Sequence, residues 1–144
     1  MRREGDGGRT APPPITKSPY EVLAAFRREL RTFLRFSEQA AAQVGLTPQQ
    51  HQLLRAIKGY PGREWATISE LSEVLALRHH SVVGIIDGSC RAGIVQRRAH
   101  ADDHRYIEVG LTPLGEERLA LLTQTHLDEL RRLWPTLAAL QPVH

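Results

Sequence analysis

Residues 67–112 read TISELSEVLALRHHSVVGIIDGSCRAGIVQRRAHADDHRYIEVGLT, and the spacing of their apolar side chains decides the fold. In the first half, apolar residues recur every three or four positions, which is the spacing of one face of an α-helix. In the second half, apolar and polar residues alternate, which is typical of strands. The stretch therefore predicts two short helices followed by two strands.

The helical half contains two helices with separate start and stop signals. Thr67 and Glu70 form a capping box that starts the first helix. Its apolar face consists of Ile68, Leu71, Val74 and Leu75. The inward face of the second helix consists of Val82, Ile85, Ile86 and Ser89. Gly93 ends this second helix, and two short helices joined by a tight turn form a helix-turn-helix.

The strand half predicts a hairpin with a long loop. The two strands are expected at residues 94–98 and 106–111, and the polar residues 99–105 connect them. In the second strand, the core-facing residues are expected to be Ile107, Val109 and Leu111, and the outward-facing residues Tyr106 and Glu108. A helix-turn-helix followed directly by a β-hairpin is a winged helix.

Two long helices are expected to flank this winged helix. Residues 20–45 carry an apolar stripe that ends at Gly45. Residues 112–140 carry a similar stripe behind a Thr112–Pro113 start, and Pro135 is expected to kink or restart that helix. Stripes of this length favour packing against another chain as well as against the chain's own core. The stripe residues are Leu23, Phe26, Leu30, Phe33, Leu34, Ser37, Ala41 and Val44 in the first helix, and Leu119, Leu122, His126, Leu130, Leu133, Leu137 and Leu140 in the last.

One more helix is expected between the first long helix and the capping box. Thr47 is its N-cap, Pro48 suits its first position, and Gln50 completes a second capping box. Its inner face is expected to consist of His51, Leu54 and Ile57, with Leu53 at the margin.

The composition is that of an ordinary globular chain. Of its 144 residues, 41% are hydrophobic and 24% are charged, and the net charge is +3. No apolar run approaches the roughly 20 residues of a membrane span, and the first residues lack the apolar block of a signal peptide. The single cysteine fits a reducing compartment, so a cytoplasmic protein with no membrane partner is expected.

The domain organisation follows from these patterns. Residues 1–19 are rich in Gly, Pro and charge, so a disordered tail is expected there. Residues 20–144 are expected to form one domain, with the helix-turn-helix and wing at 47–111 between long helices at 20–45 and 112–140.

Four segments resemble the MarR family of bacterial transcriptional regulators. They read LTPQQHQLLRAI, TISELSEVLAL, HHSVVGIIDGSCRAGIVQRR and DDHRYIEVGLTPLGEERL. The last is the most specific, because it is similar to the family's wing signature, here Asp103, Arg105, Val109, Leu111, Thr112 and Gly115. The resemblance implies a mainly α-helical fold with a small β wing, and a homodimer joined through both long terminal helices. It also implies a ligand-responsive repressor that binds a pseudo-palindromic operator in double-stranded DNA.

The candidate DNA contacts lie on the second helix of the helix-turn-helix and on the wing. The first turn of a recognition helix enters the major groove, and an arginine on a wing fits a narrow minor groove. The candidates are Arg78, His79, His80, Ser81, Gly84, Gly88, Arg98, His104 and Arg105. Gly84 and Gly88 are expected to face outward and to let the helix approach DNA closely. Asp103 is expected to pair with Arg105 and hold the turn of the wing, and His100 and His104 are expected to approach phosphate.

Other functions stay open at this point. A winged helix that binds protein instead of DNA is the alternative from another class. A catalytic function is not expected, because the chain has no Gly-rich phosphate loop and no nucleophile placed beside a base. His79 and His80 point about 100° apart on a helix, which does not suit zinc, so no metal or other cofactor is expected.

Two further expectations concern sensing. Cys90 falls at the margin of the core, which leaves a thiol-sensing variant of the regulator open, and a metal-sensing variant beside it. The resemblance also implies a small lipophilic or phenolic effector bound between the terminal helices and the winged helix. The candidate effector pocket consists of Phe33, Phe36, His51 and Trp65.

Overall fold

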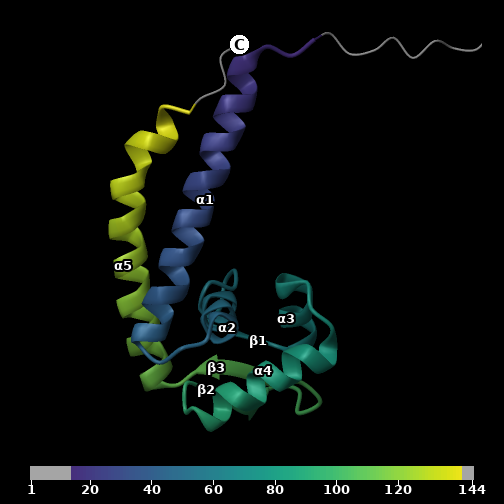
Figure 1. Cartoon of the computed structure of the whole chain (residues 1–144). Coiled ribbons are helices and arrows are strands. Elements are labelled where there is room, and N and C mark those ends of the chain that lie inside the picture. The colour runs from purple at the N-terminus through teal and green to yellow at the C-terminus, as the bar shows by residue number, and fades with distance from the viewer. Residues whose placement is uncertain (1–13, 141–144) are drawn as a thin grey trace, which may run out of the picture.

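A computed structural model describes residues 14–140 of the chain. It contains two long helices, α1 and α5, that lie side by side as a stalk above a smaller unit of helices and strands (Figure 1). The elements in chain order are α1 (Lys17–Gln43), α2 (Pro48–Lys58), β1 (Trp65–Ala66), α3 (Ile68–Leu75), α4 (His79–Arg91), β2 (Val95–Ala99), β3 (Ile107–Leu111) and α5 (Pro113–Ala138). This confirms the winged helix-turn-helix fold with long helices on both sides.

The helix boundaries follow the predicted caps closely. The Thr47, Thr67 and Thr112 hydroxyls each accept a hydrogen bond from the backbone N–H three residues later. Gly45 and Gly93 lie just after α1 and α4 with a positive φ of 74°. Only glycine adopts this left-handed backbone without strain, so both stop signals are confirmed.

The ends of the terminal helices differ from expectation. Helix α1 begins at Lys17, so the expected disordered tail is wrong for residues 17–19. Residues 1–13 of that tail lie outside the described residues, as do residues 141–144 of the expected domain. Helix α5 includes Pro135 and continues to Ala138 without a restart. A proline this close to the end of a helix removes a single backbone hydrogen bond, which the remaining turns tolerate.

The sheet has a third strand that the alternating pattern did not indicate. The strand order is β1-β3-β2 and both pairs are antiparallel, with Trp65 opposite Gly110 and Arg98 opposite Glu108. Strand β1 has two residues, which is too short for an alternating pattern. It forms because β3 offers it an open edge.

The core lies where α2, α3, α4 and the sheet meet. Its fully buried side chains include Leu54, Ile57, Leu71, Val82, Ile86 and Val109. Two expectations about this core are wrong. Leu53 is fully buried instead of marginal, and Val74 is 56% exposed on the outer side of α3. Both errors arise because the neighbouring elements, and not the helical period, decide how wide the covered face of a helix is.

The stalk leaves a large apolar surface uncovered, which we call the terminal-helix surface. Its residues are Tyr20, Leu23, Phe26, Leu30 and Leu34 of α1 and Leu121, Leu127, Leu130 and Trp134 of α5, all of them exposed. A monomeric soluble protein rarely exposes so many large apolar side chains on neighbouring helices. Within residues 14–140, no helix combines the length and the apolar character that crossing a membrane requires.

Candidate nucleic-acid interface

Helix α4 presents a polar, sterically open surface. Arg78 is its N-cap residue, and Arg78, His79 and His80 are exposed while Ser81 is half-buried. The opposite face is anchored in the core through Val82, Ile86 and Ser89, as the periodicity predicted. The helix is therefore held by one side and offers its first turn on the other, which is the placement of a recognition helix.

The two glycines of α4 leave free space on its outer side. A Cβ added at Gly84 meets nothing within 4 Å, and one added at Gly88 meets only the Arg91 side chain, at 3.8 Å. The packing of the chain therefore does not require glycine at either position. Any close approach that these glycines permit is to a molecule outside this chain.

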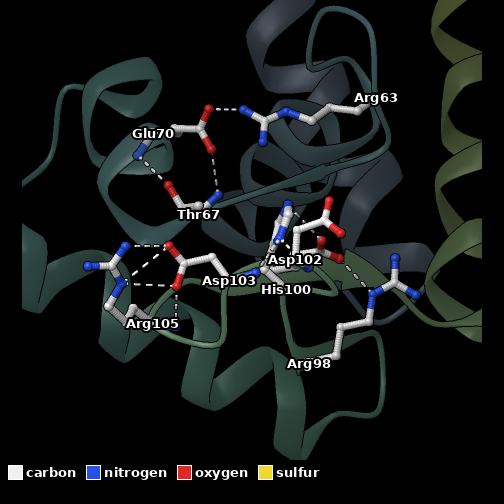
Figure 2. A network of polar contacts seen from close by, with 9 residues as sticks. Arg63, Thr67, Glu70, Arg98, His100, Asp102, Asp103 and Arg105 are labelled. Carbon is white, nitrogen blue, oxygen red and sulfur yellow. Dashed lines mark hydrogen bonds and ion pairs between the residues drawn. The ribbon is translucent and has the colours of Figure 1, made fainter.

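The tip of the wing is organised by one carboxylate. The Asp103 Oδ1 atom accepts from the Arg105 backbone N–H and from Arg105 Nε, both at 3.0 Å, and Oδ2 accepts from Arg105 Nη2 at 2.8 Å (Figure 2). These hydrogen bonds lower the pKa of Asp103 and raise that of Arg105. The hydrogen bonds hold the Arg105 guanidinium in place. Its charge still faces solvent, because the side chain is 86% exposed.

His100 closes the loop behind this tip. Its Nδ1 atom accepts hydrogen bonds from the backbone N–H groups of Asp102, at 3.1 Å, and Asp103, at 3.3 Å. Its own backbone N–H donates to the carbonyl oxygen of Tyr106 at 3.0 Å. His100 is thus tied into the loop, although it was expected to approach phosphate. His104 is exposed.

The burial of Glu108 shows that the predicted core-facing and outward-facing sides of the second strand are partly wrong. Its side chain is 8% exposed and accepts a hydrogen bond from Arg98 Nε at 2.8 Å. Its Oε1 atom lies 3.7 Å from His100 Nε2. Ile107, expected inside, is 38% exposed. The carboxylate tolerates burial because the cross-strand partner Arg98 neutralises it, a pairing that depends on the register of β2 and β3.

The base of the wing is connected to the helix-turn-helix through arginines. Arg97 pairs with Asp87 of α4 and lies 3.7 Å from the sulfur of Cys90, which is half-buried. Arg63 pairs with Glu70, the carboxylate of the α3 capping box, and its guanidinium lies 3.9 Å from the centre of the Trp65 ring. The wing is therefore held at two separate points.

The candidate effector residues separate into two places. Phe33, Phe36 and His51 surround His126 of α5, with ring centres 5.8, 5.6 and 5.1 Å from the His126 ring. Trp65 instead lies on β1 between Arg63 and His100, so the structure does not bring it to this cluster. The sequence placed Trp65 only by its apolar character, and the short strand that holds it was not foreseen.

The fold strongly alters the titration of His51. Burial, assisted by the charge of Arg55 and by His126, lowers the pKa of His51 to about 4. In contrast, among residues 14–140 no group of three or more His, Cys, Asp or Glu side chains is placed to hold a metal ion.

The family comparison matches this part of the chain. A model of the MarR family matches residues 44–105, which contain α2, α3, α4 and most of the wing. The winged-helix segment of this chain is therefore similar to the MarR family. A curated relative, the HTH-type transcriptional repressor YetL of Bacillus subtilis (strain 168), is 32% identical over 62 residues, which are 43% of this chain and 37% of that repressor.

Solved structures show that the likeness in fold includes the terminal helices. The structure of RV1404 from Mycobacterium tuberculosis superposes with a TM-score of 0.71 at 19% identity, covering 86% of this chain and 84% of that one. A mutant of S. aureus MepR bound to an oligodeoxyribonucleotide superposes with a TM-score of 0.67 at 20% identity, covering 81% of this chain and 82% of that one.

The MarR wing signature now has a physical explanation in this chain. The Thr112 hydroxyl donates to the Gly93 carbonyl at 2.6 Å and accepts from the Gly115 N–H, so it connects α4, β3 and α5. At Gly115 an added Cβ would overlap the Ile94 carbonyl, so any other residue here would force α5 to shift. The residues that sequence reasoning missed are Arg63, Glu70 and Glu108, whose pairing depends on contacts between elements. The one available signal was the capping box that contains Glu70.

Proposed function

We propose that this protein is a transcriptional regulator that binds double-stranded DNA as a homodimer and represses from a pseudo-palindromic operator. The observation that carries the proposal is the wing tip, where Asp103 holds the exposed guanidinium of Arg105 in place. Arginine held in this way suits a narrow minor groove while the first turn of α4 occupies the major groove.

The terminal-helix surface supports the homodimer part of this proposal. It is continuous with a mainly apolar groove of about 200 Å³ between α1 and α5, lined by Phe26, Glu29, Leu30, Phe33, Leu130, Leu133 and Leu137. A second copy of the same helices would cover these side chains and remove them from water. It would also bring two winged helices to one DNA duplex, which matches the symmetry of a palindromic site.

The alternative of a protein-binding winged helix has less support. Such a module would need an apolar surface on the recognition helix. The exposed residues of α4 are His79, His80, Gly84 and Arg91, which are polar, small or charged. This composition favours DNA.

The proposal is tested by fluorescence anisotropy with the DNA that flanks the protein's own gene. Arg105→Ala is expected to weaken binding by about 1–3 kcal/mol, because it removes a contact made by the wing. Arg28→Ala is the matched control, since it removes the same charge from an exposed position on α1. Equal affinity of Arg105→Ala and the parent at physiological salt would exclude the wing from DNA binding.

We further propose that a small lipophilic or phenolic effector binds at the cluster of Phe33, Phe36 and His51. The support is that these rings come from α1 and α2 and meet α5 at His126, where the stalk joins the winged helix. A ligand there would alter the angle between the stalk and the winged helix. A phenolic probe is expected to release operator DNA from the parent and to do so less well from Phe36→Ala. Equal release from both proteins would contradict this site.

A further inference from the structure

The connection between β2 and β3 poses a structural problem that one side chain solves. Residues 100–106 form a loop too irregular for a standard hairpin turn, and its backbone N–H groups need partners. The His100 ring accepts from Asp102 and Asp103, and the His100 N–H closes the loop on Tyr106. His100 therefore shapes the loop through its side chain and its backbone together.

Asp103 transmits this arrangement to the wing tip. Its backbone N–H donates to His100 Nδ1, while its carboxylate accepts four hydrogen bonds from Arg105, one of them from the Arg105 backbone. Asp103 is thus held by His100 through its backbone and holds Arg105 through its side chain. The position of the Arg105 guanidinium depends on where His100 places Asp103.

The His100 ring is itself held by the sheet. The edge of its ring meets Trp65 of β1 at 5.2 Å between centres, and its Nε2 atom faces the buried Glu108 of β3. Figure 2 shows His100 between the Asp103–Arg105 pair on one side and Arg98 on the other. A ring fixed from two strands gives the loop an acceptor at a defined position.

We propose that His100 is the positioning residue of the wing, and that its neutral ring orders the loop that presents Arg105 to DNA. The inference rests on the proposed DNA binding. It assigns His100 a different role from a direct phosphate contact, because both of its ring nitrogens already face groups of the wing.

The state of the ring decides whether this cap exists. A neutral imidazole can accept at Nδ1 while Nε2 carries its proton toward Glu108, but an imidazolium carries hydrogens on both nitrogens and cannot accept. The charged groups around the ring are Glu108 from β3, Arg98 from β2 through Glu108, and Asp102 and Asp103 within the loop. The two N–H groups of the cap require a neutral ring, because only an unprotonated Nδ1 can accept from them.

Two substitutions separate the cap from the rest of the ring. In His100→Asn, the Oδ1 atom takes the position of Nδ1 and can accept from the same two N–H groups, as in an Asx-turn. In His100→Gln, the polar atoms lie one bond farther out, so the contact to Glu108 can be kept but the cap is lost. We expect operator affinity within about 3-fold of the parent for Asn, and about 5- to 30-fold weaker binding for Gln.

A second measurement reports on the loop without DNA. NMR hydrogen exchange is expected to show protected Asp102 and Asp103 amides in the parent and in His100→Asn, and lost protection in His100→Gln.

The outcomes are distinct. Equal protection of the two amides in His100→Gln and His100→Asn would contradict the proposal that the His100 ring caps them. Lost protection in Gln with unchanged affinity would overturn the positioning role. A parent that shows the expected protection but binds no operator DNA would overturn the proposed function, and with it the role in presenting Arg105.

Discussion

At the scale of single residues, Gly84 and Gly115 are the same residue type in opposite steric surroundings. Both lie in helices, but a Cβ at Gly84 has open space around it, whereas a Cβ at Gly115 would overlap the backbone of Ile94. Gly115 is therefore required by packing within the chain. Gly84 lowers helix stability, and no packing contact within the chain requires it. This is expected for a position that contacts another molecule.

This contrast predicts two stability changes of opposite sign. Gly115→Ala should lower the free energy of unfolding by about 1–3 kcal/mol, because α5 must shift away from Ile94. Gly84→Ala should raise it by up to about 1 kcal/mol, because alanine is the better helix former. Urea unfolding at one protein concentration measures both. A neutral Gly115→Ala would mean that the start of α5 does not pack on Ile94.

At the scale of elements, α1, α2 and α5 meet through a pair of histidines, one buried and one half-buried. His51 of α2 lies against His126 of α5, which in turn contacts the Ser37 hydroxyl of α1 through Nε2 at 2.7 Å. His51 is 4% exposed, and its pKa of about 4 means that the folded protein keeps it neutral in mildly acidic solution. The junction of stalk and winged helix is therefore sensitive to acid.

The sign of the pH dependence follows from linkage. In the unfolded chain His51 has an ordinary pKa near 6.5, so below that pH the unfolded state takes up a proton that the folded state does not. Stability should fall as the pH drops from about 6.5 to about 4, by up to roughly 3 kcal/mol from this group. Urea unfolding of the parent and of His51→Gln over this range measures the difference. A constant difference between the two would show that His51 is not buried in its neutral form.

At the scale of the whole molecule, the proposed homodimer depends on the terminal-helix surface. Leu34→Glu places a charge on this surface, where Leu34 is 52% exposed, and is expected to give monomers that bind operator DNA poorly. Thr32→Glu adds the same charge at an exposed position on the other side of α1 and serves as the control. Light scattering and anisotropy are the measurements. A Leu34→Glu protein that stays a stable dimer would contradict an interface on this surface.

The sequence by itself determined the helices, the caps, the hairpin and the order in which they follow one another. These features depend on local rules: the Thr47, Thr67 and Thr112 caps act over three residues, and periodicity acts within one element. The Asp103–Arg105 pair was predictable for the same reason, since its partners are two positions apart.

Only the tertiary structure decided which polar groups are buried and which partners they have. Glu108 lies inside because the register of β2 and β3 places Arg98 opposite to it, and Trp65 meets His100 because β3 accepts a third strand. Such pairings join residues distant in sequence, and their energy depends on geometry and burial that no local pattern encodes. The role of His100 as a loop cap belongs to this class, because the sheet fixes its ring where two N–H groups can reach it.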